Sequence, residues 1–249
     1  MSLDHLALLA ADIDACAAAL AAGPADAPVA GCPGWSLHAL GAHLGGVQRW
    51  ARAAILTGQM PKLDPADDPV PPAMADLAAW LRAGGERLLA TLTATDPQQP
   101  TWHPFPVEPK LAGLWRRRQA QEASVHRWDA ELAAGLEPTI DSGFAADGVD
   151  EYWHVMLPRM LSREQRPVPA SVFGVQLTDT GQRWVIDGRS GRVEVVAPDT
   201  TPDTTPDAEI TGGAVDVLLR LWGRPVAEAT VLASGAAVVS SAWLALGGA

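Results

Sequence analysis

The sequence has very few cysteines. Only Cys16 and Cys32 occur among 249 residues, which excludes a fold held together by a disulfide framework. The two cysteines also lack the paired spacing of a Cys-rich zinc site. We therefore expect both to be small side chains that are buried or half-buried.

Positive charge and long apolar runs are also scarce. A formal net charge of −11 repels phosphate backbones and argues against nucleic acid as a partner. The one dense basic run, Arg116–Arg118, is short enough to be a solvated helix turn or to meet a small anionic substrate. No run of about 18 apolar residues is free of charge, and the first residues lack the basic character of a signal peptide. We expect a cytoplasmic protein with no membrane partner.

What the chain does contain is enough apolar sequence for a large core, because hydrophobic residues make up 48% of it. In the first part, apolar residues recur at spacings of three and four, which predicts amphipathic helices. Four helices are predicted, over residues 2–22, 37–57, 73–93 and 111–134. Since a long proline-rich crossover at 97–109 precedes the fourth helix, we expect an antiparallel four-helix bundle.

The pattern changes after Gly143. A helix is predicted at 147–160, then short strands separated by Gly, Asp, Thr and Pro. The strands are expected at 170–177, 183–186, 192–196, 208–210 and 228–232, with helices at 213–222 and 236–246. A Pro-Asp-Thr-Thr repeat at 198–206 is read as a linker or hairpin loop. The predicted fold class is α+β, with a helical bundle at 1–142 and a small α+β domain at 143–249.

The fourth helix carries an unusual set of ionisable side chains. Glu122, His126 and Asp129 stand at positions i, i+4 and i+7, within roughly 60° of one another around a helix. Burying such groups without a partner costs several kcal/mol, and a divalent metal is the partner that fits best. The alternative is a salt-bridged face in which Arg118 or Arg127 neutralises the carboxylates.

A histidine on the second helix completes the candidate site. His43 lies inside the apolar stripe of that helix, where an isolated histidine is more often a hydrogen-bonded core residue. In a bundle it could meet Glu122 and His126, giving three N/O ligands of the kind that zinc accepts and leaving one position open. Iron, nickel and cobalt accept the same donors. Asp129 would then orient a ligand histidine, or act on substrate or water as a base.

Three motifs raise the weight of the metal hypothesis. They are Cys32-Pro33-Gly34-Trp35-Ser36 followed by His43, Arg118…Glu122-x3-His126-Arg127-Trp128-Asp129, and Leu218-Leu219-Arg220-Leu221-Trp222-Gly223-Arg224. Together they resemble the mycothiol-dependent maleylpyruvate isomerase family, over nearly the whole chain. The resemblance implies a DinB-like bundle, zinc held by His43, Glu122 and His126, and mycothiol as a cosubstrate that attacks a small electrophile.

The resemblance also implies a catalytic arginine in the second domain, for which Arg224 or Arg220 is the candidate. The turn that often follows in the family reads Ser234-Gly235-Ala236-Ala237 here and lacks its aspartate. The implied reaction is isomerisation through a reversible thiol adduct, or S-conjugation in which the thioether is the product. Two alternatives stay open: a metal-dependent hydrolase or lyase that uses bound water, and a non-catalytic binding protein with a metal-stabilised bundle. Oligomeric state leaves no signature in this sequence.

Overall fold

The computed structural model describes residues 3–196 and 204–247. The chain folds into two compact units. The first comprises Met1–Pro104 and Glu108–Thr139, and the second comprises Phe105–Val107 and Ile140–Ala249. The domain limits proposed from the sequence, 1–142 and 143–249, stay a prediction.

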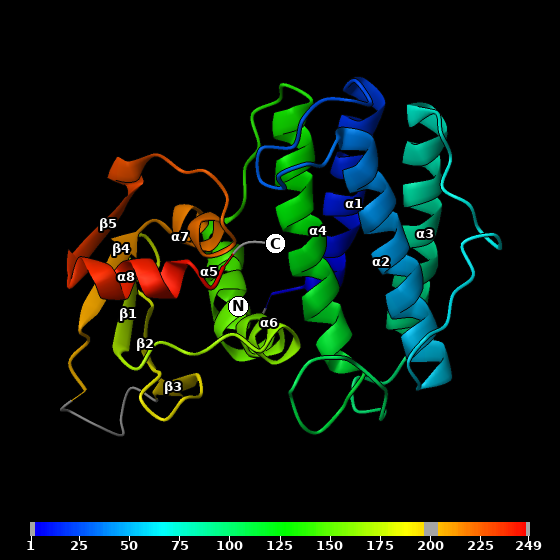
Figure 1. The fold of residues 1–249 in the computed structure, drawn as a ribbon. Helices are drawn as coiled ribbons and strands as arrows, with labels where there is room; N and C mark the ends of the chain where they lie inside the picture. Colours follow the sequence, from blue (N-terminus) through cyan, green and yellow to red (C-terminus); the bar gives the residue numbers. More distant parts are fainter. Residues whose placement is uncertain (1–2, 197–203, 248–249) are drawn as a thin grey trace. The chain divides into compact units, whose positions relative to one another are not determined.

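The first unit is a four-helix bundle (Figure 1). Its helices are α1 (His5–Ala22), α2 (Leu37–Thr57), α3 (Met74–Ala94) and α4 (Gly113–Ala133). Helices α1 and α2 each pack on both α3 and α4, and much less on each other. The predicted helices are therefore confirmed, with ends that differ by at most three residues.

Local sequence explains where these helices begin and end. The side chain of Ser36 accepts the backbone N–H of Ala39 and so caps α2. Gly58 ends α2 in the left-handed conformation, with φ of 66°. Asp4 caps α1 in the same way as Ser36 caps α2, through the N–H groups of Leu6 and Ala7.

Helix α1 is long and apolar enough to cross a membrane, judged by length and composition alone. That is weak evidence, because a core helix of a globular protein passes the same test. Here Leu9, Ile13 and Leu20 are buried in the bundle. The expected cytoplasmic location stays a prediction.

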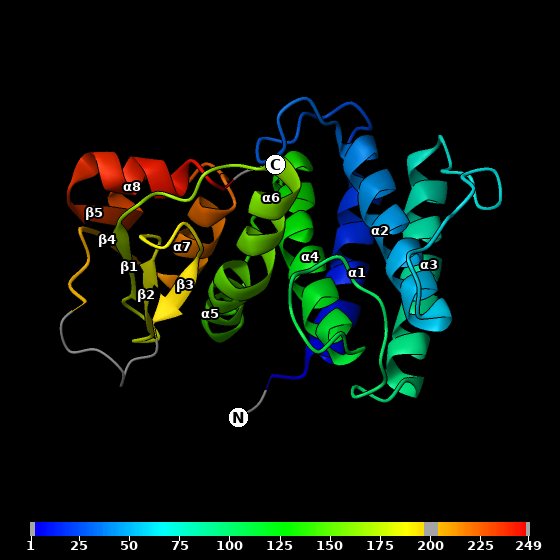
Figure 2. The same ribbon diagram turned by 60° about the horizontal axis from the view of Figure 1, so that its bottom comes forward.

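The second unit is built on a five-stranded sheet with strand order β3-β2-β1-β4-β5 (Figure 2). The strands are β1 (Val172–Leu177), β2 (Arg183–Asp187), β3 (Glu194–Val196), β4 (Ala208–Gly212) and β5 (Val231–Gly235). Strands β1 and β4 are parallel, and the other neighbours are antiparallel. The predicted α+β class is confirmed.

The helices of this unit are, in sequence order, α5 (Ser142–Glu151), α6 (Leu157–Glu164), α7 (Ala214–Leu221) and α8 (Ala237–Leu244). Trp153, Phe173 and Trp243 form an aromatic core, in which the rings of Phe173 and Trp243 stack 5.9 Å apart. Burial of these large side chains is the main source of stability in such a core.

Two sequence predictions need correction in this unit. The helix predicted at 147–160 begins earlier, because Asp141 caps it by accepting the N–H of Phe144, and a π-helical turn at Tyr152–Met156 divides it from α6. The strand predicted at 228–232 begins as a 3-10 turn, Glu228–Thr230, before β5. The Pro-Asp-Thr-Thr repeat lies mostly outside the described residues.

Candidate metal centre

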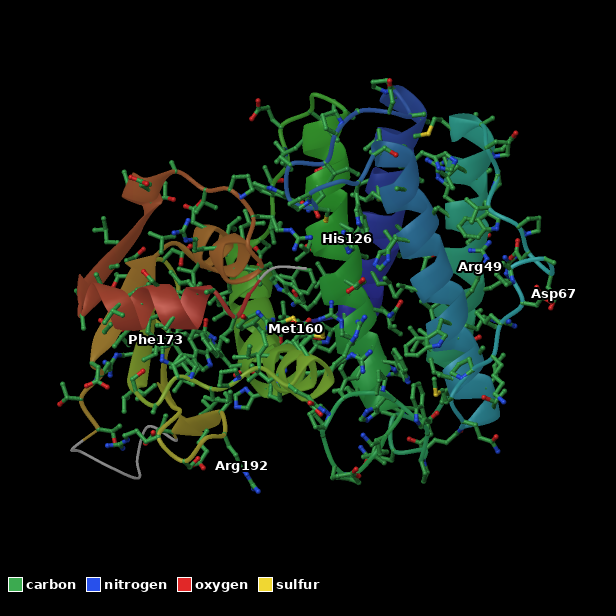
Figure 3. The ribbon with its side chains drawn as sticks, viewed as in Figure 1. Arg49, Asp67, His126, Met160, Phe173 and Arg192 are labelled. Carbon is green, nitrogen blue, oxygen red and sulfur yellow. The ribbon has the colours of Figure 1, made fainter. Side chains whose placement is uncertain are left out.

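Two helices of the bundle supply the candidate ligands. His43 lies on α2, and Glu122 and His126 lie one turn apart on α4 (Figure 3 labels His126). His43 Nε2 is 3.2 Å from Glu122 Oε1, and His126 Nε2 is 3.5 Å from the same oxygen. One donor atom from each residue lies within 4.8 Å of the others. The structure thus brings together three side chains that were expected to meet only because the helices were predicted to form a bundle.

Access to this cluster is one-sided. The His43 side chain is 36% exposed, whereas Glu122 and His126 are 16% and 11% exposed. Ring contacts with Trp35 fix both imidazoles, at centroid distances of 4.8 Å to His43 and 6.0 Å to His126. A small molecule would therefore reach the cluster from the His43 side.

Arg118 holds the carboxylate of Glu122. Its guanidinium is 3% exposed and donates from Nη2 to Glu122 Oε2 at 2.9 Å, leaving Oε1 directed at the two histidines. Burial alone would raise the pKa of Glu122. Hydrogen bonds with His126 and His43, together with the charge of Arg118, instead hold this pKa well below its usual range. The carboxyl group of Glu122 is therefore ionised in the folded protein.

A second layer lies behind His126. Asp129 Oδ2 is 3.3 Å from His126 Nδ1 and accepts a hydrogen bond from the Cys32 thiol at 3.7 Å. Asp129 is 2% exposed and Cys32 is 3% exposed. Burial opposes charge on His126, but Asp129, Cys32 and Glu122 outweigh it and raise the pKa of His126 well above its usual range. Asp129 engages Nδ1, so the other ring nitrogen, Nε2, is the one presented to the ligand cluster.

The chemistry of the donor set fits a divalent transition metal. Two imidazole nitrogens and one carboxylate oxygen converge, a combination typical of catalytic zinc sites with one open position. The carboxylates of Glu122 and Asp129 lie at the cluster with the guanidinium of Arg118 and with His126, whose proton they favour, so a metal cation would take the place of that proton. The alternative of a salt-bridged helix face holds in part. Arg118 pairs with Oε2 of Glu122, whereas Oε1 of Glu122 contacts the histidines.

Cys32 also forms a possible ligand group with His126 and Asp129. The sequence predicted only that this thiol is small and buried, so its contact with Asp129 was missed. The available signal was its position in the Cys-Pro-Gly-Trp turn, just before the helix that carries His43. That turn brings Cys32 against α4, 97 residues further along the chain.

Arg224 lies in the second unit, just after α7. It is 4% exposed, follows Gly223 with φ of 71°, and donates from Nη1 to the backbone oxygen of Trp222 at 2.9 Å. Arg220, the other candidate from the sequence, is exposed on α7. Of the two arginines, Arg224 is the one that its surroundings hold in a defined position.

Comparison with known proteins agrees with this geometry. A family model described as the mycothiol maleylpyruvate isomerase N-terminal domain matches residues 6–131, which include His43, Glu122 and His126. Because that match covers just over half of the 249 residues, the chain belongs to this family.

One solved structure resembles the chain over both units. It is the crystal structure of a histidine-to-alanine mutant of the mycothiol-dependent maleylpyruvate isomerase, with a TM-score of 0.56 and 14% sequence identity. The alignment covers 93% of this chain and 92% of that chain. At this identity the likeness shows a shared fold. A search of curated proteins gave no match.

Proposed function

We propose that this chain is a metal-dependent isomerase that uses mycothiol as its thiol cosubstrate and acts on a small electrophile of the maleylpyruvate type. The observation that carries the proposal is the convergence of His43, Glu122 and His126 within the domain that defines the family. Membership of the family and the shared fold support the choice of thiol and substrate class.

Zinc is the proposed metal, held by His43 Nε2, Glu122 Oε1 and His126 Nε2. When bound, zinc would supply the positive charge that stabilises a thiolate at neutral pH. Iron, nickel or cobalt would accept the same ligands, and elemental analysis of the purified protein distinguishes them from zinc. The described part of the chain offers no accessible cysteine at this cluster, because Cys32 is buried. The nucleophile is therefore proposed to come from the cosubstrate.

The chain's own residues prepare the site for this chemistry. Arg118 keeps Glu122 ionised and fixed, and Asp129 fixes the ring of His126. Asp129 is thereby proposed as a positioning residue, because its carboxylate is buried behind His126 and engages both His126 and Cys32. Arg224 is retained as the proposed catalytic arginine of the second unit, where an anionic substrate would need a cationic partner.

Two outcomes of thiol addition are compatible with the site. In isomerisation, the thiolate sulfur bonds to a carbon of an activated double bond, rotation follows, and elimination breaks the same C–S bond and returns the thiol. In S-conjugation, the adduct takes up a proton and the thioether is the product. The isomerase outcome is favoured by the family to which the chain belongs.

A metal-dependent hydrolase or lyase is the alternative from the sequence. It would need a base beside a bound water, the role first considered for Asp129. Asp129 is 2% exposed and already engaged by His126 and Cys32, which disfavours that role. A non-catalytic, metal-stabilised binding protein would keep the metal and show no turnover.

Metal analysis joined to a thiol assay tests the proposal. We expect the purified wild type to hold about one zinc per chain by elemental mass spectrometry, and to isomerise maleylpyruvate only when mycothiol is present. His126→Ala should lose both the metal and the activity. His154→Ala is the matched control, because His154 is a half-exposed histidine of the second unit that pairs with Asp150.

The outcomes separate the candidate functions. A wild type that binds no metal would rule out the isomerase and the hydrolase together. Bound metal with turnover in the absence of any thiol would favour the hydrolase. Bound metal with thiol consumed and not regenerated would assign S-conjugation.

A further inference from the structure

The bundle has a second polar region, on the side of α2 that faces α3. Here the connection between α2 and α3 folds over the two helices and encloses a cavity of about 750 Å³. Its walls include Gly46, Arg52, Leu63, Val70, Trp80 and Arg87. None of the residues that line it belongs to the metal-ligand cluster or to the Cys32–Asp129 pair. Figure 3 shows Arg49 between α2 and α3, and Asp67 out on the connection, both away from His126.

Asp68 ties the connection to the helices and so keeps the cavity formed. Its carboxylate accepts from Arg49 Nε at 2.6 Å and from the Trp80 indole N–H at 2.6 Å, and lies 3.5 Å from Arg87. Arg49 is further held by the backbone oxygens of Gly45 and Trp80, and its guanidinium stacks 3.5 Å over the Trp80 ring. The charge of Arg49 is thus neutralised within the wall.

Arg52 is different, because its Nε has no hydrogen-bond partner among the described residues, although it is shielded from solvent. Arg52 lies two turns after Gly45 on the same helix. Arg52 and Arg87 line both this cavity and a smaller hollow of about 340 Å³ next to it. A buried guanidinium nitrogen without a partner is costly unless an acceptor reaches it.

The carboxylates of the connection do not neutralise Arg52. Asp68 is engaged by Arg49, Trp80 and Arg87, and Asp64 turns back to accept the N–H of Ala66 at 2.9 Å. Asp67 lies on the connection and also lines the cavity, and the structure gives it no contact with Arg52. Lys62, also on the wall, adds a further cation. The lining therefore carries four cations, Arg49, Arg52, Lys62 and Arg87, against three carboxylates, Asp64, Asp67 and Asp68, a small positive excess in a chain whose net charge is −11.

Apolar side chains surround the same opening. Leu63 is 49% exposed and Val70 is 42% exposed, and both line the cavity. Met60, 66% exposed, lies in the same connection. Apolar side chains exposed together beside a cavity of this size are typical of ligand sites, which range from about 300 to 1,000 Å³.

We propose that the α2–α3 cavity binds a small amphipathic anion, with its carboxylate or phosphate group on Arg52 and its apolar body against Leu63, Val70 and Trp80. Arg87 and Lys62 supply additional positive charge at the mouth. This site is separate from the metal centre, and the proposal does not depend on what the metal centre does.

Binding of octanoate to the full-length protein tests the proposal, by isothermal titration calorimetry at low ionic strength. We expect octanoate or octyl phosphate to bind with a stoichiometry of about one, and octanol, which lacks the charge, to bind at least about tenfold more weakly. Tighter binding of octyl phosphate would assign a phosphate ligand, and tighter binding of octanoate a carboxylate.

Two substitutions address the two parts of the site. Arg52→Gln removes the charge and should weaken anion binding by about tenfold or more. Gly46→Phe should abolish binding by filling the cavity, since a Cβ atom at Gly46 would have no neighbour within 4 Å. Arg82→Gln and Gly46→Ala are the matched controls, and both should bind as the wild type does. Arg82 lies on α3 outside the cavity and pairs with Asp14.

A second measurement keeps the test decisive if Gly46→Phe does not fold. The indole N–H resonance of Trp80 should shift on addition of the anion in the wild type but not in Arg52→Gln, while that of Trp243 in the second unit stays in place. Equal binding of octanol and the two anions would overturn the proposal. So would unchanged anion affinity in Arg52→Gln, or the absence of binding by either anion.

Discussion

The two faces of α2 show how one helix serves two opposite electrostatic environments. His43 faces α4, where the carboxylates of Glu122 and Asp129 flank His126 and favour positive charge on its ring. Arg52, nine residues later and therefore about 180° around the helix, lines a cavity beside α3 whose cations outnumber its carboxylates by four to three. The two sites share a helix but no side chain.

The difference lies in how completely each set of polar groups is satisfied by the protein. On the α4 side, the carboxylates of Glu122 and Asp129 both have protein partners. One donor atom from each of His43, Glu122 and His126 lies within 4.8 Å of the others. On the α3 side, Asp68 satisfies Arg49, whereas Arg52 Nε has no partner among the residues that the structure describes. Because Arg52 lines the cavity, a ligand held there would bring this arginine an acceptor that the described residues do not supply to its Nε.

Removal of a proposed metal ligand should have the largest effect, on both metal content and turnover. Glu122→Ala removes the one anionic donor that contacts both histidines, so we expect metal content to fall to background and turnover with it. Elemental mass spectrometry and circular dichroism would measure metal and folding together. Glu131→Ala, on the same helix and paired with Arg127, is the control and should keep its metal.

Substitution of Asp129 or Cys32, which lie behind His126, should weaken metal binding less than substitution of a proposed ligand. Asp129→Ala leaves the three donors in place but frees the His126 ring, so we expect about 10- to 100-fold weaker metal binding and impaired turnover in metal-saturated protein. Competition with a chelator measures the affinity. Cys32→Ala should have a smaller effect, about twofold to fivefold, because a thiol is a weak donor. Metal loss in Asp129→Ala as complete as in Glu122→Ala would make Asp129 a ligand.

Two adjacent glycines of α2, Gly45 and Gly46, test how this helix packs against α3. An added Cβ at Gly45 would overlap the ring of Trp80, whereas at Gly46 it would meet nothing within 4 Å. We expect Gly45→Ala to destabilise the fold by about 1–3 kcal/mol through overpacking. Gly46→Ala should stabilise it by about 0.5–1 kcal/mol, because alanine is the better helix former. Chemical denaturation of both variants checks this contrast, and equal effects would contradict the packing described for Trp80.

Substitution of Asp68, which attaches the α2–α3 connection to the helices, should have the smallest effect on stability. This effect should depend on pH. Burial alone would raise the pKa of Asp68, but the hydrogen bonds from Arg49 and Trp80 outweigh it and lower this pKa below its ordinary 3.8. The stabilisation is therefore present above that ordinary value and is lost as the pH falls through the lower, folded-state value.

Asp68→Asn should accordingly cost less than about 1 kcal/mol at neutral pH, because the Asp68 side chain is 44% exposed. The cost should disappear on acidification below the ordinary carboxyl range. Denaturation curves over that pH range measure it. Asp67→Asn, one residue earlier, is the control and should leave stability unchanged; a cost that grows on acidification would contradict the role given to Asp68.

Much of the bundle was predictable from the sequence, because its signals are local. For example, α2 is defined within a few residues by its apolar spacing, its N-cap residue Ser36 and its C-cap residue Gly58. The spacing of Glu122 and His126 places both on one face of α4 without any tertiary information. The π-helical turn at Tyr152–Met156 had no such local signal, and it was missed.

The sequence by itself therefore determined the helices of the bundle, the fold class, the three candidate ligands and, through its motifs, the family. Only the tertiary structure decided that Cys32 contacts Asp129, that Arg118 leaves one oxygen of Glu122 free for the histidines, and that Arg52 lines a cavity. Helix periodicity depends on neighbours a few residues apart. These contacts join segments up to 97 residues apart or depend on the space between packed helices, which no local pattern encodes.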